Sequence, residues 1–273
     1  MRTLALIQLT FKESLAKKTF MAFFGISTLV SLLFIFALNL DIVDGAQAYI
    51  SVFGQEANSL VELDKIVVTI EGAISILLFT GGIFMALFAT SNLIPSFLES
   101  GTIDLLISKP LSRMQIFMGR FTGAIAIVAF NIFYLIVFTW LIISVKTGIW
   151  NFNFLLSGVV IVISFAILYA LMAFLGLITS SGAFSLMITY LILFFSPLLL
   201  QRDNIYALLS SKFYGYLLDG IYYVLPKTAQ LSIMTQNIVN GNPVSSWMPL
   251  WSSALFGVGI TGISVLIFNR KNF

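Results

Sequence analysis

The sequence predicts an all-α membrane protein, and three observations support this fold class. Of the 273 residues, 59% are hydrophobic and only 9% are charged, whereas a soluble domain carries about 25% charged residues. Several charge-free runs reach the ~20 residues that a helix needs to cross the hydrocarbon core. The chain contains no cysteine and no histidine, so disulfides and metal sites built on thiolate or imidazole groups are excluded.

Six spans are predicted within one transmembrane domain that covers residues 1–273, without an internal repeat. The spans lie at residues 20–40, 72–98, 121–145, 154–178, 183–200 and 248–268. The fourth and fifth come from a charge-free stretch of 55 residues, which is too long for one crossing. The small polar sequence Thr179-Ser180-Ser181-Gly182 is the turn that divides it.

Six spans put both termini on one side of the membrane, and the positive-inside rule assigns that side to the cytoplasm. This side would hold nine basic and three acidic residues, and the other side five basic and eight acidic residues. Two larger segments, Asp41–Glu71 and Gln201–Trp247, would lie outside. Within the second, Asn204–Leu225 is rich in tyrosine but contains Lys212 and Asp219. We expect outer helical or re-entrant segments there, with a seventh span as the alternative.

The connection between the second and third spans, Ser96–Arg120, carries the most informative pattern. Pro95 is expected to interrupt the second span, because proline disrupts a helix interior. Ser96 and Glu99 have the spacing of a capping box, which predicts a short helix after the interruption.

A second helix start is predicted at the end of this connection. Pro110 cannot continue the short helix and disfavours helical geometry at Lys109. Ser112 with Gln115 then offers another capping box, which opens the third span. The connection therefore reads as a compact helical knob, with an ordinary solvated loop as the alternative.

The connection contains the pattern Glu99-x-Gly101-Thr102-Ile103-x-Leu105-Leu106, then Lys109-Pro110-Leu111-Ser112-Arg113, then Gly119-Arg120. This pattern resembles the cytoplasmic loop of ABC-2 type transporter permeases, although Arg120 stands where lysine is commoner. The start of the chain, with Phe11, Lys12 and Glu13, looks like the elbow helix of that family. The sequence from Tyr222 to Pro226 is also similar to the family, with less specificity.

The resemblance implies that the loop forms a coupling helix that docks on a separate ATP-binding subunit. The ATPase-coupling residues would be Glu99, Gly101, Thr102, Asp104, Leu105, Leu106, Lys109, Pro110, Ser112 and Arg113. The N-terminal residues Phe11, Lys12 and Glu13 would belong to an interfacial elbow helix, for which a plain cytoplasmic anchor is the alternative.

The resemblance also implies an assembly in the bacterial inner membrane. Two permease chains, as a homodimer or heterodimer, would work with two ATP-binding subunits, membrane lipid and periplasmic or membrane accessory proteins, without nucleic acid. ATP and magnesium would bind to the partner subunit, so this chain is expected to need no cofactor, metal or catalytic residue of its own. Export is the direction that the family suggests, and copper-enzyme-maturation permeases are one branch that fits.

No glycine stands directly before a lysine, so the core of a phosphate-binding P-loop is absent from the chain.

Two other functions compete with this interpretation. The predicted spans contain no charged residue, which argues against an ATP-independent secondary carrier or channel, although sodium can be held by carbonyl and hydroxyl groups. A lipid-modifying enzyme would need clustered carboxylates. The only acidic cluster has the scatter of a solvated loop, and it comprises Asp41, Asp44, Glu56, Glu62, Asp64 and Glu71.

Overall fold

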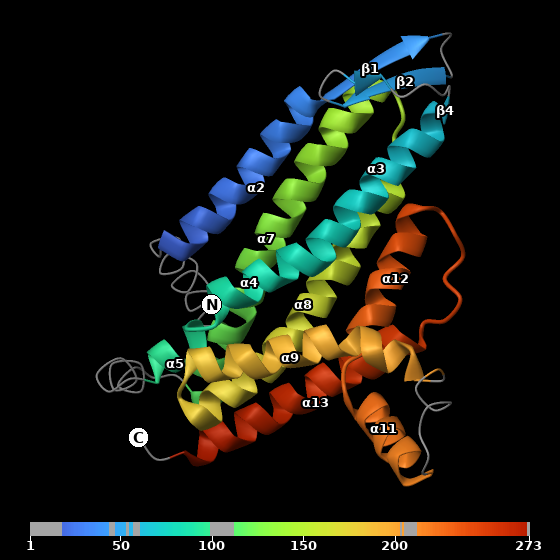
Figure 1. Cartoon of the computed structure of the whole chain (residues 1–273). Coiled ribbons are helices and arrows are strands. Elements are labelled where there is room, and N and C mark those ends of the chain that lie inside the picture. Colours follow the sequence, from blue (N-terminus) through green and yellow to red (C-terminus); the bar gives the residue numbers. More distant parts are fainter. Residues whose placement is uncertain are drawn as a thin grey trace.

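The computed structural model describes residues 18–43, 47–52, 55–56, 61–98, 112–202, 204 and 212–271. Five helices among these residues are long and apolar enough to cross a membrane (Figure 1). They are Leu63–Ser96, Arg113–Thr147, Phe152–Thr179, Gly182–Leu200 and Met248–Arg270. The prediction of a helical, multi-pass membrane protein is therefore confirmed.

The first of the six predicted spans is not among these five helices. It corresponds to α2, Lys18–Ala37, a helix of 20 residues that contains the shorter apolar segment Met21–Leu32.

The remaining helices follow in chain order. They are α3 Leu63–Leu77, the π-helical turn η1 Leu78–Gly82, α4 Ile83–Thr90, α5 Leu93–Phe97, α7 Arg113–Thr147, α8 Phe152–Thr179, α9 Gly182–Leu200, α11 Lys212–Val224, α12 Thr228–Val239 and α13 Met248–Arg270.

A small antiparallel sheet between α2 and α3 departs from the all-α expectation. Its strands are β1 Leu38–Val43, β2 Gln47–Val52, β3 Gln55–Glu56 and β4 Val61–Glu62, and β2 pairs with the other three. The sequence of β1 alternates apolar and polar residues up to Asp41, which is the period of a strand. The sheet lies at one end of the bundle, beside the end of α2 and the start of α3 (Figure 1).

The second span begins nine residues earlier than predicted, at Leu63 instead of Gly72. The prediction stopped at the charged residues Asp64, Lys65 and Glu71, but a helix that packs against protein does not have to be charge-free. At its other end the helix is interrupted at Ser91 and Asn92. Pro95 lies four residues after Ser91, where its ring would clash with the Ser91 carbonyl group of a continuous helix.

The predicted turn between the fourth and fifth spans is confirmed. Helix α8 ends at Thr179, and Ser180 takes a left-handed conformation with a φ of 53°. Ser181 then caps α9, since its hydroxyl accepts a hydrogen bond from the backbone N–H of Phe184 at 3.3 Å. Two helices therefore arise from one apolar run because small polar residues satisfy both helix ends.

Helix α8 is the central helix of the bundle. It packs against α7, α9, α12 and α13, and a larger share of its apolar window is buried than in any other candidate span. Phe154, Ile161, Phe165 and Leu168 have no exposed surface. The core of the described structure therefore runs along α8, which is buried on every face between Ile167 and Ala173.

The tyrosine-rich region after α9 contains two short helices. Helix α11 has 13 residues and α12 has 12, and both are too short to cross the hydrocarbon core. Helix α11 stands away from the bundle, whereas α12 lies against it (Figure 1). The helical part of the prediction is thus met at Lys212–Val224 and Thr228–Val239, and the seventh span stays an open alternative.

Candidate functional site

The loop that resembles the permease family lies almost entirely outside the described residues. Outside them are Glu99, Gly101, Thr102, Asp104, Leu105, Leu106, Lys109 and Pro110, and also Phe11, Lys12 and Glu13 of the expected elbow helix. Ser112 and Arg113 are described, and they stand where the loop enters α7. The site is therefore built from the base of this loop.

Ser112 forms the predicted capping box at the start of α7. Its hydroxyl accepts a hydrogen bond from the backbone N–H of Gln115 at 3.2 Å, and its own N–H donates to Gln115 Oε1 at 3.0 Å. These two bonds satisfy donors that a helix N-terminus leaves open. The chain direction at the base of the loop is thereby fixed.

Arg113 joins the base of the loop to the end of α13. Its Nη1 donates to the backbone oxygen of Asn269 at 3.2 Å and to that of Lys271 at 2.6 Å. The last carbonyl groups of a helix have no partner within the helix and carry partial negative charge. A guanidinium group there is favourable for both reasons.

Lys271 extends this contact to a third helix. Its Nζ donates to the backbone oxygen of Leu177 at 2.9 Å, in the last turn of α8. We call Ser112, Arg113, Lys271 and the carbonyl groups that they bind the loop-end junction. Through it, the start of α7 and the ends of α8 and α13 are connected by side-chain hydrogen bonds.

The start of α9 packs closely beside the interruption of the second span. A Cβ atom on Gly182 would lie 2.9 Å from the Ser91 carbonyl oxygen and would also overlap the side-chain amide of Asn92. Pro95 likewise lies against Gly176 in α8. The chain that leads into the loop is therefore tied to α8 and α9 before the described residues stop at Leu98.

Arg120 lies inside the bundle, although the sequence placed it on the cytoplasmic surface. Its side chain is 3% exposed, on a face of α7 that also carries the buried Phe117 and Phe121. In the sequence, Phe117 stands three residues before Arg120 and Phe121 one residue after it, and these apolar neighbours could have indicated that Arg120 is buried. A buried guanidinium group in α7 means that this span is not charge-free.

Glu71 is the second buried charge-bearing residue, and it lies near the opposite end of the bundle. It was predicted to belong to a solvated loop, but its side chain has no exposed surface in α3. It continues the buried stripe of Leu63 and Val67 at a spacing of four residues, and this spacing could have revealed its burial. Among the described residues, no group of three or more acidic side chains is placed to hold a metal ion.

An apolar groove of about 500 Å³ lies between the second span, α9 and α12. Two helix irregularities border it, the π-helical turn η1 and Pro197 inside α9. Most of its lining is apolar or aromatic, with Phe79, Phe84, Phe194 and Ile233 among the contributors. π-helical turns occur frequently at functional sites, so the groove is a candidate site for an apolar ligand.

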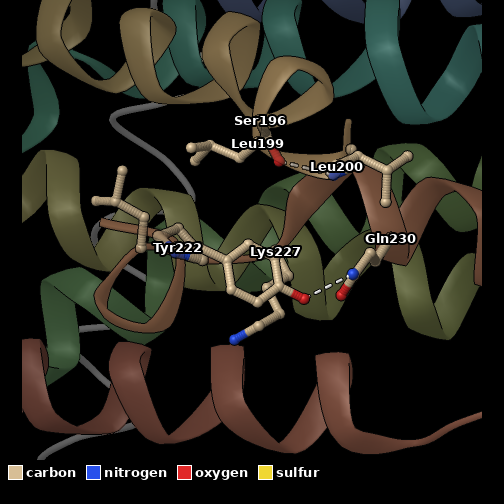
Figure 2. A pocket seen from close by; sticks show the side chains of 9 residues that line it. Ser196, Leu199, Leu200, Tyr222, Lys227 and Gln230 are labelled. Carbon is tan, nitrogen blue, oxygen red and sulfur yellow. Dashed lines mark hydrogen bonds between the residues drawn. The ribbon is translucent and has the colours of Figure 1, made fainter. Parts of the chain in front are cut away.

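Two cations flank a tyrosine where α9, α11 and α12 meet. The guanidinium carbon of Arg202 lies 3.9 Å from the centre of the Tyr222 ring, and Lys227 Nζ lies 4.9 Å from it. Gln230 Nε2 lies 2.7 Å from the Tyr222 hydroxyl oxygen in a hydrogen bond (Figure 2). Burial and the nearby Arg202 lower the pKa of Lys227. The tyrosine content of this region indicated an interface, but the pairing with both cations was not predicted.

No protein-family model matches this chain, and no curated protein sequence does either. The likeness to ABC-2 type permeases therefore rests on the sequence patterns alone, chiefly on that of the loop.

Proposed function

We propose that this chain is the permease subunit of an ATP-driven transporter of the ABC-2 type, embedded in the bacterial inner membrane and working in export. In this proposal the chain has six spans with both termini in the cytoplasm, and α2 is the first span. It pairs with a second permease chain and with two ATP-binding subunits that hold ATP and magnesium.

The loop-end junction is the observation that carries the proposal. Arg113 and Lys271 connect the base of the loop to the ends of α8 and α13, and α8 is the central helix of the bundle. A partner that pushed on residues 99–111 would therefore act on three spans together. Such a connection is what transmission of a partner's movement requires, because packed elements pass on discrete displacements.

The ATP-binding partner is tested by purification of the full chain from its native membrane. We expect a subunit with a P-loop and ATPase activity to copurify, and Glu99→Ala and Gly101→Leu to lower the ATPase activity without reducing insertion. Arg270→Gln is the matched control, since Arg270 is exposed at the end of α13. Absence of an ATP-binding subunit, or full ATPase activity in both loop variants, would contradict the proposal.

In the same proposal, the groove between η1, α9 and α12 contributes to the transport path. A Cβ atom on Gly81 would make only an ordinary contact, 3.8 Å from Leu77 Cδ1, so Gly81→Trp would fill the groove and is expected to block transport. Gly259→Trp is the control, because Gly259 is exposed and has nothing within 4 Å of its missing Cβ. Equal transport by both variants would exclude the groove.

An ATP-independent, ion-coupled carrier is the second candidate, and Glu71 favours it. A buried carboxyl group within a candidate span is a usual feature of ion-coupled transport. Proteoliposomes that contain only this chain provide the test. Solute movement driven by an ion gradient, lost in Glu71→Gln and retained in Asp64→Asn, would support the carrier over the permease.

A further inference from the structure

Glu71 has one carboxylate oxygen that nothing in the described structure satisfies. Its Oε2 accepts a hydrogen bond from Asn151 Nδ2 at 2.8 Å, whereas its Oε1 has no hydrogen-bond partner among the described residues. The side chain has no exposed surface. An ionised carboxylate in such a place would lose most of its hydration and regain only one neutral donor.

Oxygen atoms with partial negative charge lie beside the contact between Glu71 and Asn151. The same Asn151 amide nitrogen donates to the backbone oxygen of Val239 at 3.1 Å, and Val239 is the last residue of α12. The carbonyl end of a helix carries partial negative charge. On the neighbouring position of α3, a Cβ atom on Gly72 would lie 3.4 Å from Asn240 Oδ1. These neighbours disfavour a negative charge at Glu71.

Two of the helices packed against α3 carry no charge that could compensate an ionised Glu71. Helices α8 and α12 contain no charged residue, and η1 contains none. Of the other elements packed against α3, β4 carries Glu62, and α7 carries Lys146 in its last turn and Arg113 and Arg120 near its start. Asp64 and Lys65 on α3 itself are exposed, about two turns before Glu71.

We propose that Glu71 is a proton-binding site, and that its proton holds α12 against α3 and α8. With the proton on the carboxyl group the side chain is neutral, and burial costs far less than for a carboxylate. Loss of the proton to water leaves a buried negative charge beside the carbonyl end of α12, which repels those carbonyl oxygens and favours separation of α12 from α3. The proposal does not depend on the transport function, because its tests follow the carboxyl group and α12 directly.

Infrared difference spectroscopy of the unmodified protein is the first test. We expect the stretching band of a neutral carboxylic acid at about pH 7, where exposed acidic side chains are ionised. This band should disappear at higher pH and be absent from Glu71→Gln. An unmodified protein without the band at neutral pH overturns the proposal, whatever the variants do.

Thermal unfolding in detergent between about pH 5 and about pH 9 is the second test. A group that is protonated in the folded state and ionised in the unfolded state makes stability fall as the pH rises. We expect the Tm of the unmodified protein to fall by about 5 °C more across this range than that of Glu71→Gln. Asp64→Asn removes the same charge from an exposed position of the same helix, so it should keep the unmodified profile. Identical profiles for the unmodified protein and Glu71→Gln overturn the proposal.

Thiol labelling reports on α12 itself, and the chain has no native cysteine to remove. Thr235 is 1% exposed on α12, so Thr235→Cys should react slowly while Glu71 is protonated. We expect its labelling rate to rise with pH at least tenfold more than the rate in a Thr235→Cys, Glu71→Gln double variant, which reports the intrinsic reactivity of the thiol. Equal pH dependence in the two proteins shows that the proton does not hold α12 and overturns that part of the proposal.

Discussion

The two ends of the bundle use the same backbone feature with opposite charges. At the loop-end junction, the cations Arg113 and Lys271 meet the carbonyl ends of α13 and α8. At the sheet end, the carboxyl group of Glu71 shares the amide of Asn151 with the carbonyl end of α12. Carbonyl groups at a helix end attract a cation and repel an anion. The charge therefore favours the first arrangement, whereas the second is favourable in the proposal only while Glu71 carries a proton.

This contrast separates two roles for charge within one membrane domain. The cations at the loop end connect helices through hydrogen bonds to backbone carbonyl groups. The buried carboxyl group at the sheet end can change its charge, and so can change the contacts of α12. The proposed force-receiving end and the proposed proton-binding end therefore differ in side-chain chemistry, and four variants test this difference.

The largest effect is expected at the sheet end, for Asn151→Leu. The substitution removes the cap of α8, since Asn151 Oδ1 accepts from the N–H of Asn153, and it leaves both Glu71 oxygens without a described donor. We expect the free energy of unfolding to fall by about 3 kcal/mol, measured by unfolding in mixed detergent micelles. Asn242→Leu, at an exposed position, is the control and should lose less than about 0.5 kcal/mol. A small loss at Asn151 would show that the sheet end does not rely on this amide.

Gly182→Ala is expected to have the next largest effect, at the loop end. The added Cβ atom would meet the Ser91 carbonyl oxygen at 2.9 Å, which forces α9 away from the end of the second span. We expect a loss of about 2 kcal/mol in the same unfolding assay. Gly259→Ala has nothing within 4 Å of its Cβ atom inside α13, so it should stabilise the protein by about 0.5–1 kcal/mol. The comparison fails if Gly182→Ala and Gly259→Ala change the free energy of unfolding in the same direction.

Arg113→Gln removes the cation from the loop-end junction and should cost about 1 kcal/mol, because the bonds are partly exposed. The larger consequence is expected in function. Because the loop would be coupled less tightly to the end of α13, the ATPase activity of the copurified complex should depend less on the loop residues. Arg270→Gln, which removes an exposed charge from the same region, provides the baseline. An Arg113 variant that matches this baseline in both assays would remove the junction from the proposed force path.

Lys227 extends the comparison to a cation at the N-terminal end of a helix, where a positive charge is unfavourable. It is the N-cap residue of α12 and is 5% exposed. Burial first, and then the nearby Arg202, lower its pKa, and the positive end of α12 acts in the same direction. The unfolded chain therefore binds more protons than the folded chain as the pH approaches about 10.4, so stability should rise slightly with pH in that range. Lys227→Gln should lack this rise in a Tm series, and an unchanged slope would contradict the assignment.

Most helix boundaries were predictable because charges and small polar residues mark them. The capping pair Ser112 and Gln115 and the turn around Ser180 rely on local chemistry, and the structure contains both. The helix of the second span starts at Leu63, before the predicted span, because Glu71 reads as a surface residue when its neighbours in space are unknown. Burial of α12 was missed for the same reason, since its contacts with α8 and α3 join residues far apart in the sequence.

The candidate site was predictable only in part. The base of the loop agrees with its capping prediction, but the contact between Arg113 and the end of α13 spans 158 positions to Lys271, and no local pattern encodes it. The cations around Tyr222 were invisible for a related reason, because Arg202 and Tyr222 come from different helices. Charge alone indicated a surface position for Arg120, and its apolar neighbours were the better guide.

The π-helical turn η1 changes which faces of one long helix meet which neighbours. Each α-helical residue turns the helix by about 100°, so a widened turn rotates the faces of α3 and α4 relative to each other. Before the turn, α3 packs against α12, α8 and α7, and after it α4 packs against α8, α2 and α9. The continuous helical stretch from Leu63 to Thr90 thereby serves two different sets of neighbours, and Phe79, Thr80 and Gly81 of the turn itself line the groove.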